Sequence, residues 1–131
     1  MSYYIAKELQ TPFDRAVAAV REALKSEGFG VLTEIDVQAT LKTKLDVDSR
    51  KYRVLGACNP PFAHRALEIE DKIGLMLPCN VIVQEVDEGS VEVAAIDPVA
   101  SMRAVDNPAL GAVGAEVREK LARVIDRVRA D

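Results

Sequence analysis

Two Cys-Asn steps contain the side chains in this sequence that are best suited to chemistry. Cys58-Asn59 and Cys79-Asn80 each stand where an apolar, strand-like run meets a loop, and the only histidine, His64, lies between them. Thiolate and imidazole are the ligands that zinc and copper prefer. Cys58, His64 and Cys79 are therefore candidate ligands of a soft metal ion, with copper or zinc as the expected cofactor.

The distance between the two cysteines decides whether such a site can form. If the strands that flank the intervening helix are parallel neighbours, Cys58 and Cys79 lie at opposite edges of the sheet. A strand of six residues is about 20 Å long, which is far beyond ligand distance. The site forms only if residues 75–78 carry the chain back to the same edge. A fourth ligand would then come from Asp97, Met76, Met102 or water.

Cys58 is also a candidate reactive thiol. It stands just before a helix expected to begin near Pro61, and the positive end of a helix dipole favours the thiolate. His64, about one turn into that helix, would add to this effect. The competing interpretation is structural, because free cysteines often serve as small buried hydrophobic residues.

A third interpretation is a pocket for a small ligand. Three predicted helices begin at a proline, and helix N-termini bind anions. Asn59, Asn80 and Asp97 are the candidate ligand-binding residues, because amide and carboxylate groups can orient a small polar molecule. Asparagine is equally typical of helix caps and turns.

Composition narrows the choice of function. The chain has 131 residues, of which 49% are apolar and 29% charged, and its formal charge is -4. This is typical of a single globular domain, residues 1–131, that is large enough for its own core. Acidic and basic residues are interleaved, whereas nucleic-acid binding needs a clustered basic surface, so no nucleic acid partner is expected.

Targeting signals and enzyme motifs are also missing from the sequence. The N-terminus does not resemble a signal peptide, and no run approaches the roughly 20 apolar residues of a membrane span. We therefore expect a cytoplasmic protein without a membrane partner, in which both cysteines stay reduced. The sequence contains no P-loop, G-x-S-x-G, H-E-x-x-H or G-x-G-x-x-G motif, so whether it is an enzyme stays open.

Hydrophobic periodicity predicts an α+β fold. Alternating apolar residues predict strands at 2–9, 29–37, 52–58, 79–86 and 91–96, with a hairpin turn at 87–90. Apolar stripes at helical spacing predict helices at 12–28, 61–74 and 108–128, and a short helix at 40–45. Thr11 is expected to cap the first helix and Gly28 to end it. The natural solution is one sheet covered mainly on one face by helices.

Several blocks of sequence resemble a known family. Leu55-Gly56-Ala57-Cys58-Asn59-Pro60, residues 75–81 (LMLPCNV) and Ile96-Asp97-Pro98 are similar to the signature blocks of the family called domain of unknown function 302. The resemblance implies an antiparallel sheet of about five strands with helices on one face, in an arrangement resembling the TATA-binding-protein-like fold. It also implies a homodimer. It carries no DNA-binding function, because a fold does not determine a function.

These observations support three hypotheses about function. The first is a dimeric binding module for a small ligand or a soft metal at the Cys58 and Cys79 blocks. The second is a thiol-dependent redox or sulfur-transfer protein that uses Cys58. The third is a purely structural dimerising domain with both cysteines in its core.

Overall fold

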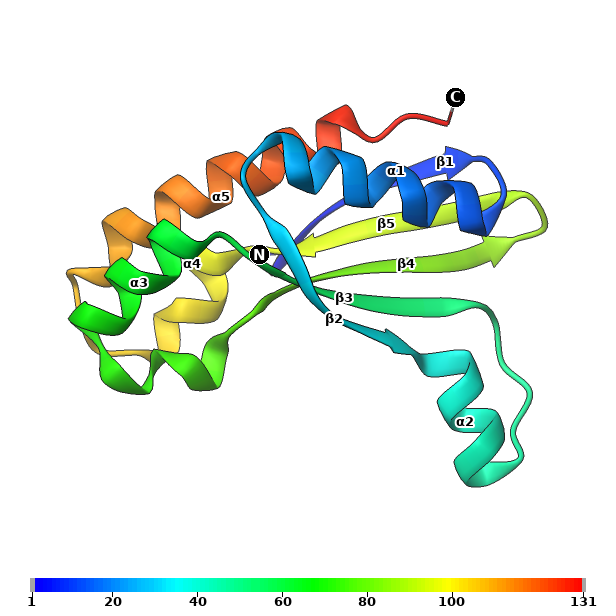
Figure 1. Ribbon diagram of the computed structural model, residues 1–131, viewed down its shortest axis with the longest axis horizontal. Helices are drawn as coiled ribbons and strands as arrows, with labels where there is room; N and C mark the ends of the chain where they lie inside the picture. The colour runs from blue at the N-terminus through cyan, green and yellow to red at the C-terminus, as the bar shows by residue number, and fades with distance from the viewer. Residues whose placement is uncertain (1, 131) are drawn as a thin grey trace.

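Five strands form one antiparallel sheet in the computed structural model, which describes residues 2–130 (Figure 1). Their order across the sheet is β1-β5-β4-β3-β2, and every neighbouring pair is antiparallel. The predicted α+β fold with about five antiparallel strands is confirmed. The bounds of the strands are β1 Tyr4–Gln10, β2 Gly30–Asp36, β3 Tyr52–Cys58, β4 Cys79–Asp87 and β5 Ser90–Ile96.

The long helices gather on one face of the sheet, and the short helix α2 projects away from it (Figure 1). None of the helices in residues 2–130 is both long and apolar enough to cross a bilayer. The helices are α1 Phe13–Ser26, α2 Val37–Leu45, α3 Pro60–Ile69, α4 Pro98–Ser101 and α5 Leu110–Arg127, with 3-10 turns η1 Asp71–Met76 and η2 Met102–Ala104.

The core lies between this helical layer and the sheet. In β4 the side chains of Cys79, Val81 and Val83 are buried, whereas Asn80 is exposed on the other face. This alternation follows from the two-residue period of a strand. The apolar stripes predicted for the helices are buried in α1 and α5: Phe13, Val17, Val20, Leu24, Val113, Val117, Leu121 and Val124.

Gly28 and Thr11 show what local sequence can and cannot predict at the ends of α1. Gly28 has φ of +85°, in the left-handed region expected after a helix end. Thr11 was expected to cap α1, and this is wrong. Its hydroxyl donates to the carbonyl of Ala130 instead, and α1 has no side-chain cap.

The predicted helix at 61–74 is interrupted at Glu70, which has an extended backbone. The side-chain amide of Asn107 donates to the carbonyl of Ile69 at 3.1 Å and to the Glu70 carboxylate at 3.2 Å. Asn107 thus satisfies the carbonyl of Ile69, a group that a continued helix would have bonded. The chain then forms η1 and reverses its direction, which brings β4 back beside β3.

Candidate functional site

The antiparallel pairing of β3 and β4 places both cysteines at the same end of the sheet. Ala57 pairs with Cys79, so Cys58, the last residue of β3, lies next to the first residue of β4. The alternative of parallel neighbours, which would separate Cys58 and Cys79 by the length of a strand, is therefore wrong. Residues 70–78 carry the chain back to the same edge.

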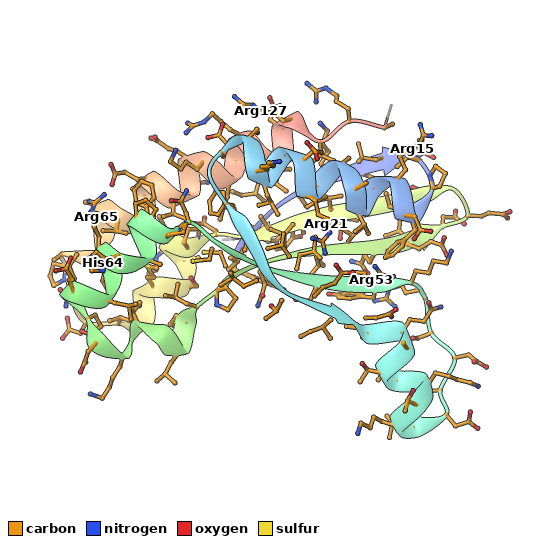
Figure 2. The ribbon with its side chains drawn as sticks, in the orientation of Figure 1. Arg15, Arg21, Arg53, His64, Arg65 and Arg127 are labelled. Carbon is orange, nitrogen blue, oxygen red and sulfur yellow. The ribbon has the colours of Figure 1, made fainter. Side chains whose placement is uncertain are left out.

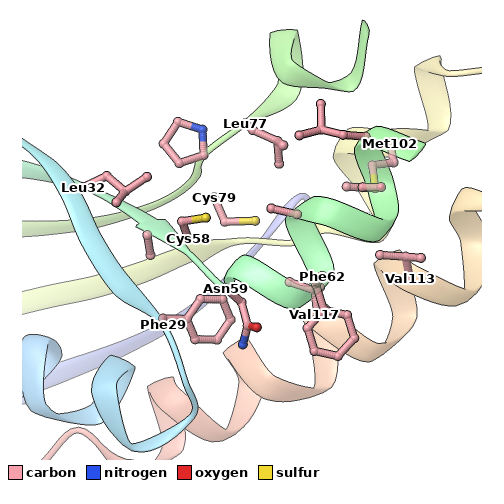
Figure 3. A pocket seen from close by; sticks show the side chains of 15 residues that line it. Phe29, Leu32, Cys58, Asn59, Phe62, Leu77, Cys79, Met102, Val113 and Val117 are labelled. Atoms are coloured by element: carbon pink, nitrogen blue, oxygen red, sulfur yellow. The ribbon is translucent and has the colours of Figure 1, made fainter. Parts of the chain in front are cut away.

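Both cysteines line one pocket beneath α3 (Figure 3). The pocket has a volume of about 300 Å³ and lies between the ends of β3 and β4, the helix α3 and the first turns of α5. Of the described residues that line it, none is charged. Its walls comprise Phe29, Leu32, Ala57, Cys58, Asn59, Phe62, Ala63, Ala66, Leu67, Leu77, Pro78, Cys79, Met102, Val113 and Val117.

A bulge in β2 contributes Leu32 to the pocket. The register of β2 with β3 shifts between Val31 and Thr33, so Leu32 has no partner across the ladder. Leu32 is largely exposed and lies at the rim of the pocket (Figure 3). The alternation of apolar and polar residues along β2 did not predict that Leu32 lies at the pocket.

Small side chains keep the pocket open. Ala63 and Ala66 present only methyl groups to the cavity from α3, and Ala66 is the one residue of α3 that is buried. The aromatic rings of Phe29 and Phe62 lie on the side of the pocket that faces α5 (Figure 3). Alanines at these positions in α3 are the sequence signal that could have indicated a cavity.

Asn59 is buried and performs a structural task. Its Nδ2 donates to the backbone carbonyl of Glu27 at 3.2 Å, which ties the start of α3 to the end of α1. A Cβ atom on Gly28 would lie 3.3 Å from the same Nδ2. Asn59 therefore lines the pocket with an amide that is already engaged by the backbone.

The two thiols differ in exposure and in acidity. Cys58 is half-buried and Cys79 is buried, and both are free. Burial raises the pKa of the Cys79 thiol to about 11, and the charge of Cys58 adds to this increase. Cys79 is therefore a neutral thiol near pH 7.

His64 does not join the cysteines. It lies on the outer side of α3, beside Arg65 (Figure 2). Its side chain is 76% exposed, and its Nε2 lies 3.3 Å from the Glu68 carboxylate one turn later. Within residues 2–130, no three His, Cys, Asp or Glu side chains are grouped so that they could hold a metal ion. The predicted ligand set of Cys58, His64 and Cys79 is thus not brought together.

Asn80 and Asp97 also lie outside the pocket. Asn80 faces a separate hollow on the other side of the sheet, with Tyr4 and Tyr52. Asp97 caps α4 by accepting from the N–H of Val99 at 2.9 Å, and it pairs with Arg118 at 2.9 Å. Of the three predicted ligand-binding residues, the structure places only Asn59 at the pocket.

The electrostatics of Asp97 reflect its structural position. Burial opposes ionisation of this carboxyl, but hydrogen bonds from Arg118 and from the N–H groups at the start of α4 outweigh that effect. The net result is a pKa below the ordinary value for aspartate. Asp97 is thus a carboxylate that holds α4 against α5.

Comparison with known proteins agrees with this architecture. The sequence profile described as "Domain of unknown function DUF302" matches residues 5–128. A crystal structure of the uncharacterized conserved protein DUF302 from Bacillus stearothermophilus superposes with a TM-score of 0.91 at 29% identity, covering 98% of this chain and 100% of that one. No curated protein matches. The chain belongs to the DUF302 family.

Proposed function

We propose that this protein is a binding module for a small, apolar molecule that occupies the pocket beneath α3. The observation that supports the proposal is a cavity of about 300 Å³ whose described walls are uncharged and, apart from the amide of Asn59, apolar. Small-molecule sites are typically concave, largely apolar and of this size or larger. The pocket also lies where the predicted Cys58 and Cys79 blocks meet.

The character of the lining defines the chemical class of the ligand. Phe29 and Phe62 offer aromatic faces, and Cys58, Cys79 and Met102 offer polarizable sulfur atoms. Among the described lining residues, the one side-chain amide is that of Asn59, and it is engaged by the Glu27 carbonyl. A neutral aromatic or branched aliphatic compound therefore matches these walls better than a polar anion, whose burial without partners is costly.

The apolar ligand is favoured over the soft metal. The pocket presents two thiols, whereas structural zinc sites use four ligands and catalytic ones use three and a water. His64 is directed away from the pocket and pairs with Glu68. A metal ion would require a histidine or carboxylate side chain to move into the pocket. An apolar ligand requires no such change in the pocket walls.

Filling the cavity tests this proposal. Ala63→Leu places three extra carbons on the pocket wall, while Ala115→Leu makes the same change on the exposed surface of α5. We expect N-phenyl-1-naphthylamine, a neutral apolar fluorophore, to bind the native protein and the Ala115 variant equally. We expect its affinity for the Ala63 variant to fall at least about tenfold, or roughly 1.4 kcal/mol.

Fluorescence titration of all three proteins measures the effect, and circular dichroism checks that each is folded. Equal binding to the native protein and the Ala63 variant would place the fluorophore elsewhere and refute the pocket as the site. Absence of binding to the native protein would do the same.

The homodimer stays a prediction. The face of the sheet opposite the helices carries Tyr4, Ile82 and Ile96 at or near the surface, and a second copy packed there would cover them. Sedimentation equilibrium of the native protein measures the state of association directly.

A further inference from the structure

The pocket wall contains two free thiols on adjacent strands. Cys58 ends β3 and Cys79 begins β4, and in the ladder Cys79 stands opposite Ala57. Both side chains line the same cavity, and their sulfur atoms are on its inner side (Figure 3). Such a pair can do chemistry that neither cysteine can do alone.

The separation of the two Cα atoms falls within the range found in disulfides. Cys58 is displaced by one residue from direct opposition to Cys79. The spacing between strands and the rise per residue then give a Cα···Cα separation of about 6 Å. Disulfides are found at Cα···Cα separations of about 4.4–6.8 Å. Strict alternation would place the two side chains on opposite faces, but Cys58 is the terminal residue of β3 and shares the pocket with Cys79.

We propose that Cys58 and Cys79 form a redox-active dithiol that exchanges with small disulfides and closes to a cross-strand disulfide. The Cys58 thiolate attacks one sulfur of the small disulfide RSSR, and the bond between its sulfurs breaks, releasing RS⁻. Cys79 then gives up its proton to the released thiolate and attacks the Cys58 sulfur, which expels the second RS⁻. The protein loses two electrons and two protons, and RSSR becomes two RSH.

The difference in burial between Cys58 and Cys79 indicates which thiol reacts first. Cys58 is half-buried and can be reached from the pocket, whereas Cys79 is only 8% exposed. The pKa of Cys79, raised to about 11 by burial and by the charge of Cys58, keeps it protonated while Cys58 attacks. Once Cys58 is held in the mixed disulfide its charge is gone, and one of the two causes that raise the pKa of Cys79 is removed.

This chemistry does not depend on ligand binding, although it uses a wall of the same pocket. The uncharged lining favours a neutral oxidant, so 2-hydroxyethyl disulfide is the appropriate probe. The reaction is followed on the full, folded chain by intact-mass spectrometry after acid quenching. Variants Cys58→Ser and Cys79→Ser provide the matched pair.

For the native protein we expect loss of two hydrogens within one chain and full recovery on adding excess reduced thiol. Cys79→Ser should accumulate one 2-mercaptoethanol adduct on Cys58, because the second thiol is missing. Cys58→Ser should form its adduct at least about tenfold more slowly, because Cys79 is buried.

Three outcomes would overturn the proposal. Stable double adducts on the native protein would show that the sulfur atoms do not reach each other. A disulfide between chains, seen as a doubled mass, would show that Cys58 meets another molecule instead. Unreacted thiols in the folded protein would show that both cysteines are inert. Loss of N-phenyl-1-naphthylamine binding to Ala63→Leu is a separate readout, so either proposal can fail alone.

Discussion

The helical layer covers the two ends of the sheet in different ways. Over one end, α1 and the second half of α5 fill the space completely, with Leu24, Leu121 and Val124 fully buried. Over the other end, α3 buries only Ala66 and leaves the pocket between itself and the strand ends. We call these the packed end and the hollow end.

Polar contacts follow the same division. At the packed end the Glu27 carboxylate is 7% exposed and meets Arg127 at 2.8 Å, Arg123 at 3.0 Å and Lys120 at 4.0 Å. At the hollow end Asp97 meets a single cation, Arg118. The packed end therefore contributes most to the stability of the fold, and the hollow end has the space for a ligand and contains the two thiols. Stability and candidate function thus occupy separate parts of one sheet.

The largest contrast should come from one negative charge introduced at either of two positions in α5, one at the hollow end and one at the packed end. Val124 is fully buried at the packed end, and Val117 lines the pocket two turns earlier. Val124→Asp should unfold the protein, because an unpaired buried carboxylate costs several kcal/mol of a total stability of about 5–15 kcal/mol. Val117→Asp should cost at least about 1 kcal/mol less, because the side chain of Val117 borders the pocket and is not enclosed by packed side chains on every side.

Thermal unfolding followed by circular dichroism measures both variants. Equal destabilisation would remove the distinction between the packed end and the hollow end, because it would mean that Val117 is packed as tightly as Val124.

A smaller effect is expected from the carboxylate at the packed end. Glu27→Gln keeps the shape of the side chain but removes the charge that faces three cations. We expect a loss of about 1–2 kcal/mol, because the carboxylate is buried while its arginine partners are half-exposed. Glu116→Gln is the matched control, since Glu116 pairs with Arg65 in an exposed contact and should cost about 0–0.5 kcal/mol. Urea unfolding measures both, and similar losses would contradict the assignment.

The smallest effect concerns Asp97 at the hollow end, and it depends on pH. Asp97→Asn removes the ion pair with Arg118 but keeps an oxygen that can accept from Val99. We expect a loss of about 0.5–1 kcal/mol at pH 7. Because the folded-state pKa of Asp97 is lowered, its contribution is present above the ordinary aspartate pKa and disappears as the pH falls through the lowered value.

The stability difference between native protein and variant should therefore shrink as the pH falls from 7 to below the ordinary aspartate pKa of 3.8, with most of the loss below that value. A series of urea titrations measures it. A difference that stays constant over this range would show that Asp97 does not act through its charge.

Local patterns predicted most of the fold. The spacing of Val113, Val117, Leu121 and Val124 predicted the buried face of α5, and Gly28 predicted the end of α1, because each signal acts within a few residues. The break at Glu70 could not be predicted. It depends on Asn107, which donates to the end of α3 from 37 residues away in sequence.

The candidate site was predicted only in part. Cys58, Asn59 and Cys79 were identified from their position at strand ends, and the structure places all three at one pocket. His64 was included because it is the only histidine, but the phase of α3 directs it outward. The pairing of β3 with β4 depends on the turn of the chain at residues 70–78, where Asn107 contacts the end of α3 from far away in sequence, so local spacing did not predict it.

The contact between Gly28 and Asn59 has a consequence for how the pocket could change. Asn59 stands at the start of α3, and its side-chain amide donates a hydrogen bond to the carbonyl of Glu27. Gly28 has no side chain, which leaves room for that amide to approach. The start of α3, the helix that covers the pocket, is thus held by Glu27 and Gly28, which do not line the pocket. Selection for altered ligand preference should therefore recover substitutions at positions 27 and 28 as well as in the pocket walls. A small displacement of the contact between Asn59 and Glu27 would change the angle of α3 over the pocket.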